Sequence, residues 1–129
     1  MSHSLYAFYG SLRRGMRLHH QFKNHLHYSH SLWLKGYDLY SLGNYPFAIK
    51  SVDPNRKILV ELTRISDDET EKSIGDIERQ AGYVADKIQL GDDIVTIFLF
   101  EDAANNLRID SGDWVAFFGQ QPNLQHFIG

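Results

Sequence analysis

An apolar segment that stops abruptly at a glycine constrains the fold of this chain more than any other feature. The segment Leu5–Tyr9 contains three aromatic residues and no charged residue, and Gly10 follows it directly. Such a run predicts a buried strand that enters a tight turn. The turn extends to Gly15, so the sequence predicts a strand followed by a glycine-bounded loop near the N-terminus.

Apolar side chains at intervals of four residues follow this turn. They are Leu18, Phe22 and Leu26. Residues spaced in this way share one face of a helix, so we predict an amphipathic helix over residues 16–26.

Residues 31–42 are rich in Leu, Trp and Tyr and predict an extended strand with one irregularity at Gly36. This strand is expected to end at the turn-forming residues 43–46. Near the C-terminus, residues 113–118 predict a last short strand.

Two pairs of apolar segments predict antiparallel hairpins, because turn-forming residues separate their members. The first pair is residues 47–52 and 57–65. The second is residues 83–90 and 94–100, and the last of these segments reads as a strand buried on both faces.

A second helix is predicted over residues 67–80. Ser66 and Glu69 have the spacing of a capping box, in which both side chains satisfy backbone donors at a helix start. Gly82 is a suitable stop. Together these elements predict an α+β class: one domain over residues 1–129, with a small mixed or antiparallel β-barrel and flanking helices.

Composition excludes several kinds of partner and cofactor. The net charge of −3 gives no long-range attraction to nucleic acid, and the 129 residues contain no long apolar run for a membrane span and no secretory signal, so we expect a cytoplasmic protein. Without cysteine there is no thiolate metal site. A homodimer is compatible with the aromatic content, because aromatic side chains serve in interfaces as well as in cores.

The turn over residues 10–15 is a candidate anion site. Backbone N–H groups can converge where a strand passes through a glycine turn into a helix, and the helix start adds a positive end. The alternative is a plain turn that needs glycine only for its backbone angles. The turn lacks the Lys-Ser/Thr pair of a P-loop, so nucleotide phosphate is a poor fit.

Glu78 is a candidate general acid/base. It follows Ile74 by one helical turn and lies next to Ile77, at the margin of the predicted buried stripe. A partly buried carboxylate has a raised pKa and can exchange a proton near neutral pH. Glu71, two turns earlier on the same face, is an equal candidate, and periodicity does not choose between them.

Five of the seven histidines lie between residues 19 and 30. None of the spacings between neighbours in this group has the i, i+4 separation of helical metal ligands, and no Asp or Glu precedes residue 38. We therefore predict no metal site there and keep only His20, close to the turn, as a candidate substrate contact.

The segment Leu5–Gly15, with its Tyr9-Gly10-Ser11-Leu12 turn, closely resembles the opening motif of gamma-glutamylcyclotransferase-like proteins. Further similarities follow in the order of that family. They are Gly36 with Leu39 and Tyr40, Gly43 with Tyr45 and Pro46, Val60-Glu61-Leu62, Ile74 to Glu78, Tyr83, and Ile109 to Trp114.

This resemblance implies the small mixed barrel of that family and an enzyme that releases 5-oxoproline from a gamma-glutamyl amine or amino acid. It also implies that Glu78, rather than Glu71, is the catalytic acid/base, with Tyr9, Gly10, Ser11, Leu12 and Tyr83 binding the small-molecule substrate, and that no cofactor or metal is needed. The alternative is a non-catalytic module that binds a small carboxylate or phosphate in the same glycine turn.

Overall fold

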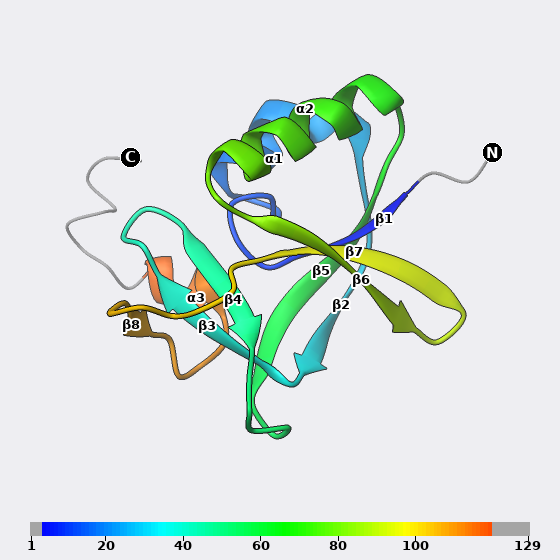
Figure 1. The fold of residues 1–129 in the computed structure, drawn as a ribbon. Helices are drawn as coiled ribbons and strands as arrows, with labels where there is room; N and C mark the ends of the chain where they lie inside the picture. The colour runs from blue at the N-terminus through cyan, green and yellow to red at the C-terminus, as the bar shows by residue number, and fades with distance from the viewer. Residues whose placement is uncertain (1–3, 120–129) are drawn as a thin grey trace.

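The strand that follows the N-terminus is the central strand of the larger sheet. The computed structural model describes residues 4–119 of the chain. Strand β1 (Leu5–Phe8) is antiparallel to β5 (Lys57–Ile65) on one side and parallel to β7 (Asp93–Leu99) on the other. Strands β2 (Leu26–Lys35) and β6 (Val84–Leu90) complete the order β2-β5-β1-β7-β6 (Figure 1). The buried strand predicted at residues 5–9 is thus confirmed, and the sheet is mixed.

A smaller sheet lies beside this one and contains β4 (Pro46–Lys50), β3 (Tyr37–Ser41) and β8 (Leu107–Arg108) in that order. The chain passes from β2 to β3 at Gly36, which has φ +89°. The predicted strand over residues 31–42 is therefore two strands in two sheets. The irregularity expected at Gly36 is the point where the chain leaves the first sheet.

The pairing of β4 differs from the prediction. Its partner is β3, with Leu39 opposite Ala48, whereas β5 pairs with β1 and β2. The hairpin predicted from residues 47–52 and 57–65 is therefore wrong, because the short turn between them connects two sheets. The second predicted hairpin is confirmed: β6 and β7 are antiparallel neighbours.

The helices are shorter or placed differently than the sequence predicts. Helix α1 covers only Arg17–Phe22, a 3-10 turn η1 covers Lys23–His25, and Leu26 already belongs to β2. Leu26 is buried there beside the helix rather than within it. Residues 114–119 form helix α3 (Trp114–Gly119), so the last strand predicted at residues 113–118 is wrong.

Helix α2 (Asp68–Gln80) confirms the second predicted helix. Its N-cap is Asp67, whose carboxylate accepts a hydrogen bond from the Thr70 N–H at 3.0 Å, so the capping box predicted at Ser66 is wrong by one residue. At the other end Gly82, with φ +102°, stops the helix as predicted. The N–H of Tyr83 donates to the Glu78 carbonyl at 3.0 Å, an arrangement typical of helices that end at a glycine.

Both faces of the larger sheet are packed against other side chains. Successive side chains of β1 point to opposite faces and belong to two different hydrophobic clusters. Tyr6 and Phe8 pack in the cluster that also contains Ile74 of α2. Leu5 and Ala7 pack in the other cluster, which contains the fully buried Trp114 of α3. In Figure 1, α1 and α2 lie together at one end of the strands, and α3 lies near the smaller sheet.

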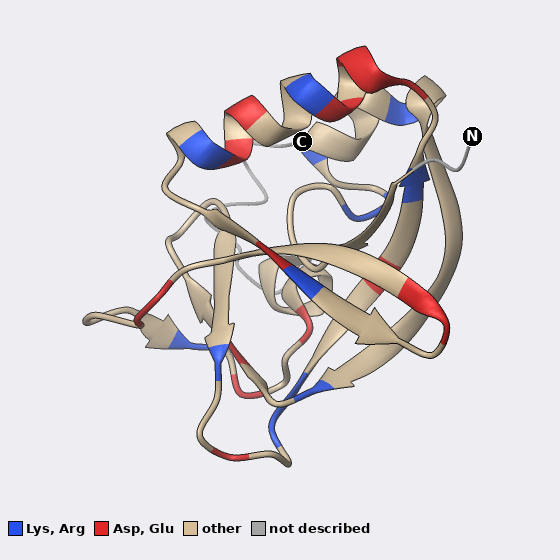
Figure 2. Ribbon diagram, turned by 45° about the vertical axis from the view of Figure 1, so that its right-hand side comes forward, with Lys and Arg blue, Asp and Glu red and all other residues tan. Residues whose placement is uncertain are grey.

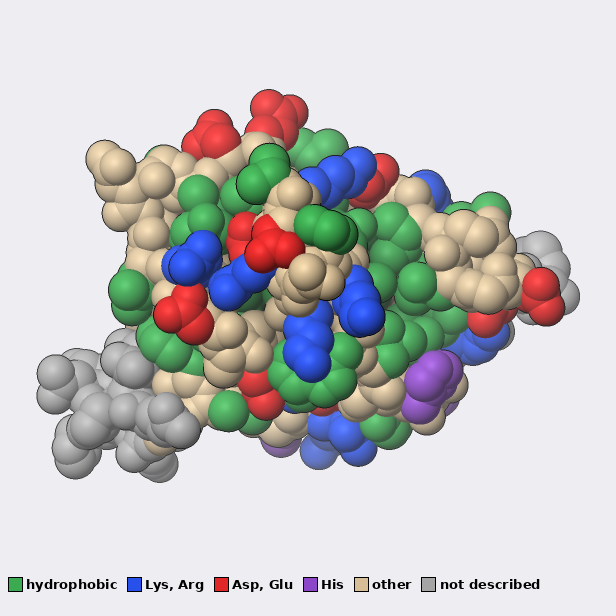
Figure 3. All heavy atoms as spheres, turned by 90° about the horizontal axis from the view of Figure 1, so that it is seen from below, with side chains coloured by type: hydrophobic (Ala, Val, Ile, Leu, Met, Phe, Trp, Pro, Cys, Tyr) green, Lys and Arg blue, Asp and Glu red, His purple; other side chains and the backbone are tan. Residues whose placement is uncertain are grey.

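The α+β class is confirmed, with the strands arranged in two sheets so that the term barrel applies only loosely. Helix α2 contains both acidic and basic residues (Figure 2). The face of the molecule drawn in Figure 3 also carries both signs of charge among apolar groups. Within residues 4–119, no helix is long and apolar enough to cross a membrane.

Gly112 should be far less tolerant of substitution than Gly91. Both have positive φ, +70° and +60°, but a Cβ at Gly112 would lie 2.1 Å from the Lys57 carbonyl oxygen, whereas a Cβ at Gly91 would meet open space. Gly112→Ala should cost about 2 kcal/mol more than Gly91→Ala, because overpacking adds to the shared backbone strain. Urea denaturation of both variants checks this, and equal losses would contradict it.

Candidate active site

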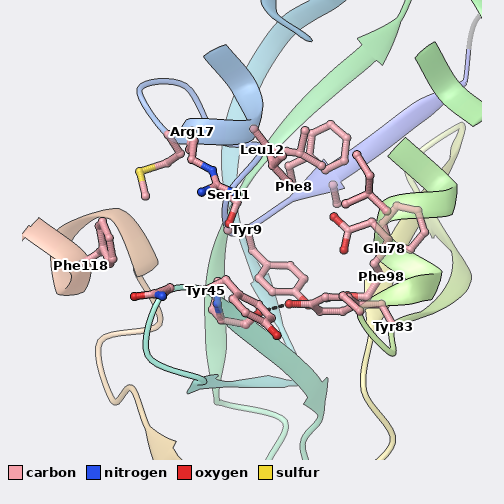
Figure 4. Close-up of a pocket in the computed structure, with 18 of the residues that line it drawn as sticks. Phe8, Tyr9, Ser11, Leu12, Arg17, Tyr45, Glu78, Tyr83, Phe98 and Phe118 are labelled. Carbon is pink, nitrogen blue, oxygen red and sulfur yellow. Dashed lines mark hydrogen bonds between the residues drawn. The ribbon is translucent and has the colours of Figure 1, made fainter. Parts of the chain in front are cut away.

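A cavity of about 580 Å³ opens between the turn after β1, the start of α1 and the C-terminal half of α2. Its volume is within the range of small-molecule sites. The residues predicted to act together all line it: Tyr9, Gly10, Ser11, Leu12, Glu78 and Tyr83. Figure 4 shows this cavity and labels five of them, Gly10 excepted. Positions up to 74 residues apart in the chain thus meet at one hollow, and their roles toward a substrate remain predictions.

A buried ion-pair network holds the turn in place from behind. The Arg13 guanidinium donates to Glu61 on β5 at 3.1 Å and to Asp113 at 2.8 Å. Glu61 also accepts the Arg14 backbone N–H at 2.9 Å. Arg13 and Glu61 are only 6% and 3% exposed, so both charges are satisfied by each other rather than by water.

Gly10 is required by close packing at the mouth of the turn. A Cβ on this residue would lie 2.7 Å from Cγ of Pro46, the first residue of β4. The Arg13 N–H donates to the Gly10 carbonyl at 3.0 Å, which closes the turn. The Ser11 and Leu12 backbone N–H groups donate no hydrogen bond to any residue between 4 and 119. Because both residues line the cavity, their N–H groups are candidate donors to an anion.

Glu78 points from α2 into the cavity (Figure 4). Burial raises the pKa of its carboxyl to about 7. No residue between 4 and 119 forms a hydrogen bond or ion pair with this carboxylate. A carboxyl with a pKa near neutrality and free oxygen atoms can both accept and return a proton.

Glu71, the other candidate from the sequence, has a different environment. It accepts a hydrogen bond from the Tyr6 hydroxyl at 2.5 Å and does not line the cavity. Periodicity could not separate the two carboxylates because both lie on one face of α2. The cavity separates them, since the α2 residues that line it are Ile77 and Glu78, in the C-terminal half of the helix.

The two predicted tyrosines use their hydroxyl groups to join the elements of the site. The Tyr9 hydroxyl donates to the Phe98 carbonyl and accepts the Ala48 N–H, and the Tyr83 hydroxyl donates to the Pro46 carbonyl. Burial raises the pKa of both phenols, and the nearby Glu78 carboxylate adds to the effect. Both side chains therefore remain neutral and shape the cavity with their rings.

The histidine-rich segment is separate from this site. His20 in α1 is exposed and does not line the cavity, so the expected substrate contact is not seen. Within residues 4–119, no group of three His, Cys, Asp or Glu side chains is arranged to hold a metal ion. Sequence reasoning also missed the roles of Glu61 and Pro46, because both act through contacts with distant segments.

The fold and the cavity define a small α+β protein in which a half-buried carboxylate, Glu78, lines the same cavity as the glycine turn. The sequence pattern of the family described as "Gamma-glutamyl cyclotransferase, AIG2-like" matches residues 6–116, and the chain belongs to this family. Comparison with curated proteins gives no match.

Solved structures include similar folds from several organisms. An uncharacterized protein of Pyrococcus horikoshii is 28% identical, with a TM-score of 0.75 and 96% of each chain covered. The protein ytfP of Escherichia coli is 25% identical, with a TM-score of 0.69, covering 86% of this chain and 96% of that one. An AIG2-like protein of Mus musculus shares the fold at 18% identity and a TM-score of 0.56, covering 80% of this chain and 79% of that one.

Neutralising Glu61 should destabilise the protein. Glu61→Gln removes one of the two carboxylates that pair with the buried Arg13 and should cost about 3 kcal/mol of unfolding free energy. Asp110→Asn serves as the control, because the Asp110 side chain is 77% exposed and pairs with Arg108 at the surface. Its loss should be small. Chemical denaturation compares the two, and equal, small losses would show that the network does not anchor the turn.

Ionisation of Glu78 should weaken the fold as the pH rises. Its pKa is about 7 in the folded protein against an ordinary 4.5, so the folded state binds the proton more tightly. Stability is then lost progressively between these two values as the pH increases. From pH 5 to pH 8, wild type should lose about 2 to 3 kcal/mol relative to Glu78→Gln. Denaturation of both proteins at the two pH values measures this, and parallel curves would contradict it.

Proposed function

We propose that the protein is a cyclotransferase that releases 5-oxoproline from a gamma-glutamyl compound. The observation that carries the proposal is the placement of Glu78, with a pKa of about 7, across one cavity from the unpaired N–H groups of Ser11 and Leu12. Membership of the gamma-glutamyl cyclotransferase, AIG2-like family supports it.

The reaction needs one proton to move between two nitrogen atoms. The free α-amino nitrogen of the substrate attacks the γ-carbonyl carbon, and a C–N bond forms as the ring closes. Glu78 takes the proton that the attacking nitrogen loses and gives it to the leaving nitrogen as the original amide C–N bond breaks. The products are 5-oxoproline and an amine or amino acid, and all atoms balance without a redox partner.

The turn would bind the negative charge of the substrate. N–H groups that are already oriented need no reorganisation during the reaction, and one such donor typically contributes about 3 kcal/mol to an oxyanion. The Arg13–Glu61 network keeps the Ser11 and Leu12 donors in place. The aromatic walls, including Phe8 and Phe98, exclude water from the side of the cavity next to Glu78.

Glu78→Gln should abolish turnover while Glu71→Gln should not. The substitutions are chemically identical and lie two turns apart on α2, but only Glu78 lines the cavity. Loss of the acid/base should lower kcat by about 10²-fold or more. Mass spectrometry of 5-oxoproline across gamma-glutamyl amino acids, amines and peptides measures this.

Three results would count against the proposal. Full activity of Glu78→Gln would remove Glu78 from the mechanism, and equal losses in both variants would indicate a structural effect of the helix. Thermal stabilisation by gamma-glutamyl compounds without any product would favour the anion-binding module instead.

A further inference from the structure

Two arginines lie in the glycine turn and a third follows it, and the three differ in their partners. Arg13 and Arg14 both pair with Glu61, at 3.1 and 3.2 Å. Arg17 forms no hydrogen bond or ion pair with any residue between 4 and 119. A guanidinium without a counter-charge next to a cavity is free to bind an anionic ligand.

Arg17 lines the cavity on the side opposite Glu78. In Figure 4, the Arg17 and Phe118 side chains lie on one side, Glu78 lies on the other, and Ser11 of the turn is between them. Among the described residues that line the cavity, Arg17 and Glu78 alone have side chains that carry charge. The cavity therefore offers a proton-exchanging group at one end and a fixed cation at the other.

The reaction assigns different parts of a substrate to the two ends. The γ-amide must lie within proton-transfer reach of Glu78, and the Ser11 and Leu12 N–H groups are donors for the glutamyl part. The leaving group has to point toward solvent. Five lining residues are exposed, Gly15, Arg17, Asn44, Tyr45 and Ala81, and Arg17 is the charged one among them. A carboxylate on the leaving group would meet the guanidinium there.

We infer that Arg17 is a specificity-determining residue that binds the carboxylate of an amino-acid leaving group, so that gamma-glutamyl amino acids are preferred over gamma-glutamyl amines. This inference rests on the proposed function. A guanidinium suits the role because its planar donors match both oxygens of a carboxylate.

The test uses two substrates that differ only by that carboxylate, gamma-glutamylalanine and gamma-glutamylethylamine. Arg17→Gln should lower kcat/KM for gamma-glutamylalanine about tenfold, the effect of losing a partly solvated charge-assisted hydrogen bond. For gamma-glutamylethylamine the change should stay below about twofold. Lys23→Gln is the matched control: it removes the same charge six residues later, outside the cavity, and should leave both values unchanged.

The dependence of the substrate preference on salt concentration is a second measurement. Because Arg17 is exposed, screening should reduce the wild-type preference for gamma-glutamylalanine as ionic strength rises, whereas Arg17→Gln should show little preference at any salt concentration. Equal losses on both substrates would mean that Arg17 contacts the glutamyl part and would overturn the inference. An unchanged preference in Arg17→Gln would overturn it as well.

Failure of the proposed function can be distinguished from failure of this inference. If wild type releases 5-oxoproline from both compounds with equal kcat/KM, the proposed function stands and the inference is wrong. If neither compound is cyclised, calorimetry still tests the contact between Arg17 and the carboxylate. Binding of both compounds is measured to Glu78→Gln and to the double variant that also carries Arg17→Gln. Selective loss of gamma-glutamylalanine binding in the double variant supports the contact, and equal binding of the two compounds overturns it.

Discussion

The buried pair between Arg13 and Glu61 is the interaction on which the candidate site depends. It fixes a loop of glycine and polar residues to β5, the strand next to β1 in the larger sheet. A loop so close to a cavity would otherwise sample many conformations, and its N–H groups would not stay aligned. Because Glu61 accepts from both the Arg13 side chain and the Arg14 backbone, it determines position and orientation together.

Glu61 and Glu78 show how the surroundings of a carboxylate determine whether it is held in an ion pair or can exchange a proton. Glu61 is surrounded by donors and has no free oxygen for a ligand. Glu78 is half-buried in a cavity lined mainly by apolar and aromatic side chains, has no such donor among residues 4–119, and desolvation raises its pKa to about 7. A carboxylate is therefore held in ion pairs at Glu61, whereas at Glu78 it can exchange a proton near neutral pH. The glycine that ends α2 brings Tyr83 back beneath Glu78, so helix termination also shapes the site.

Local patterns predicted those parts of the fold that local forces determine. The strand before Gly10, the helix stopped by Gly82 and the hairpin of β6 and β7 each depend on residues close in sequence. The wrong hairpin between β4 and β5 has a different origin. A Pro-Asn turn between two apolar strands is compatible with pairing, but β5 instead pairs on both edges, with β1 and β2, and no local signal in the sequence indicates these distant partners.

In the candidate site, too, some residues could be predicted from the sequence, whereas the roles of others depend on contacts between segments far apart in the chain. The turn and Glu78 could be named from motif and resemblance, yet the choice between Glu78 and Glu71 needed either the family pattern or the position of the turn relative to α2. Glu61 and Pro46 act only through contacts with the turn and with Tyr83, which lie 36 or more residues away. Arg17 is a further example: Arg13 and Arg14 pair with Glu61, whereas Arg17 has no ion pair among residues 4–119 and lines the cavity. Three nearby arginines in a sequence do not show which of them will pair with a carboxylate, because that depends on which side of the turn faces Glu61.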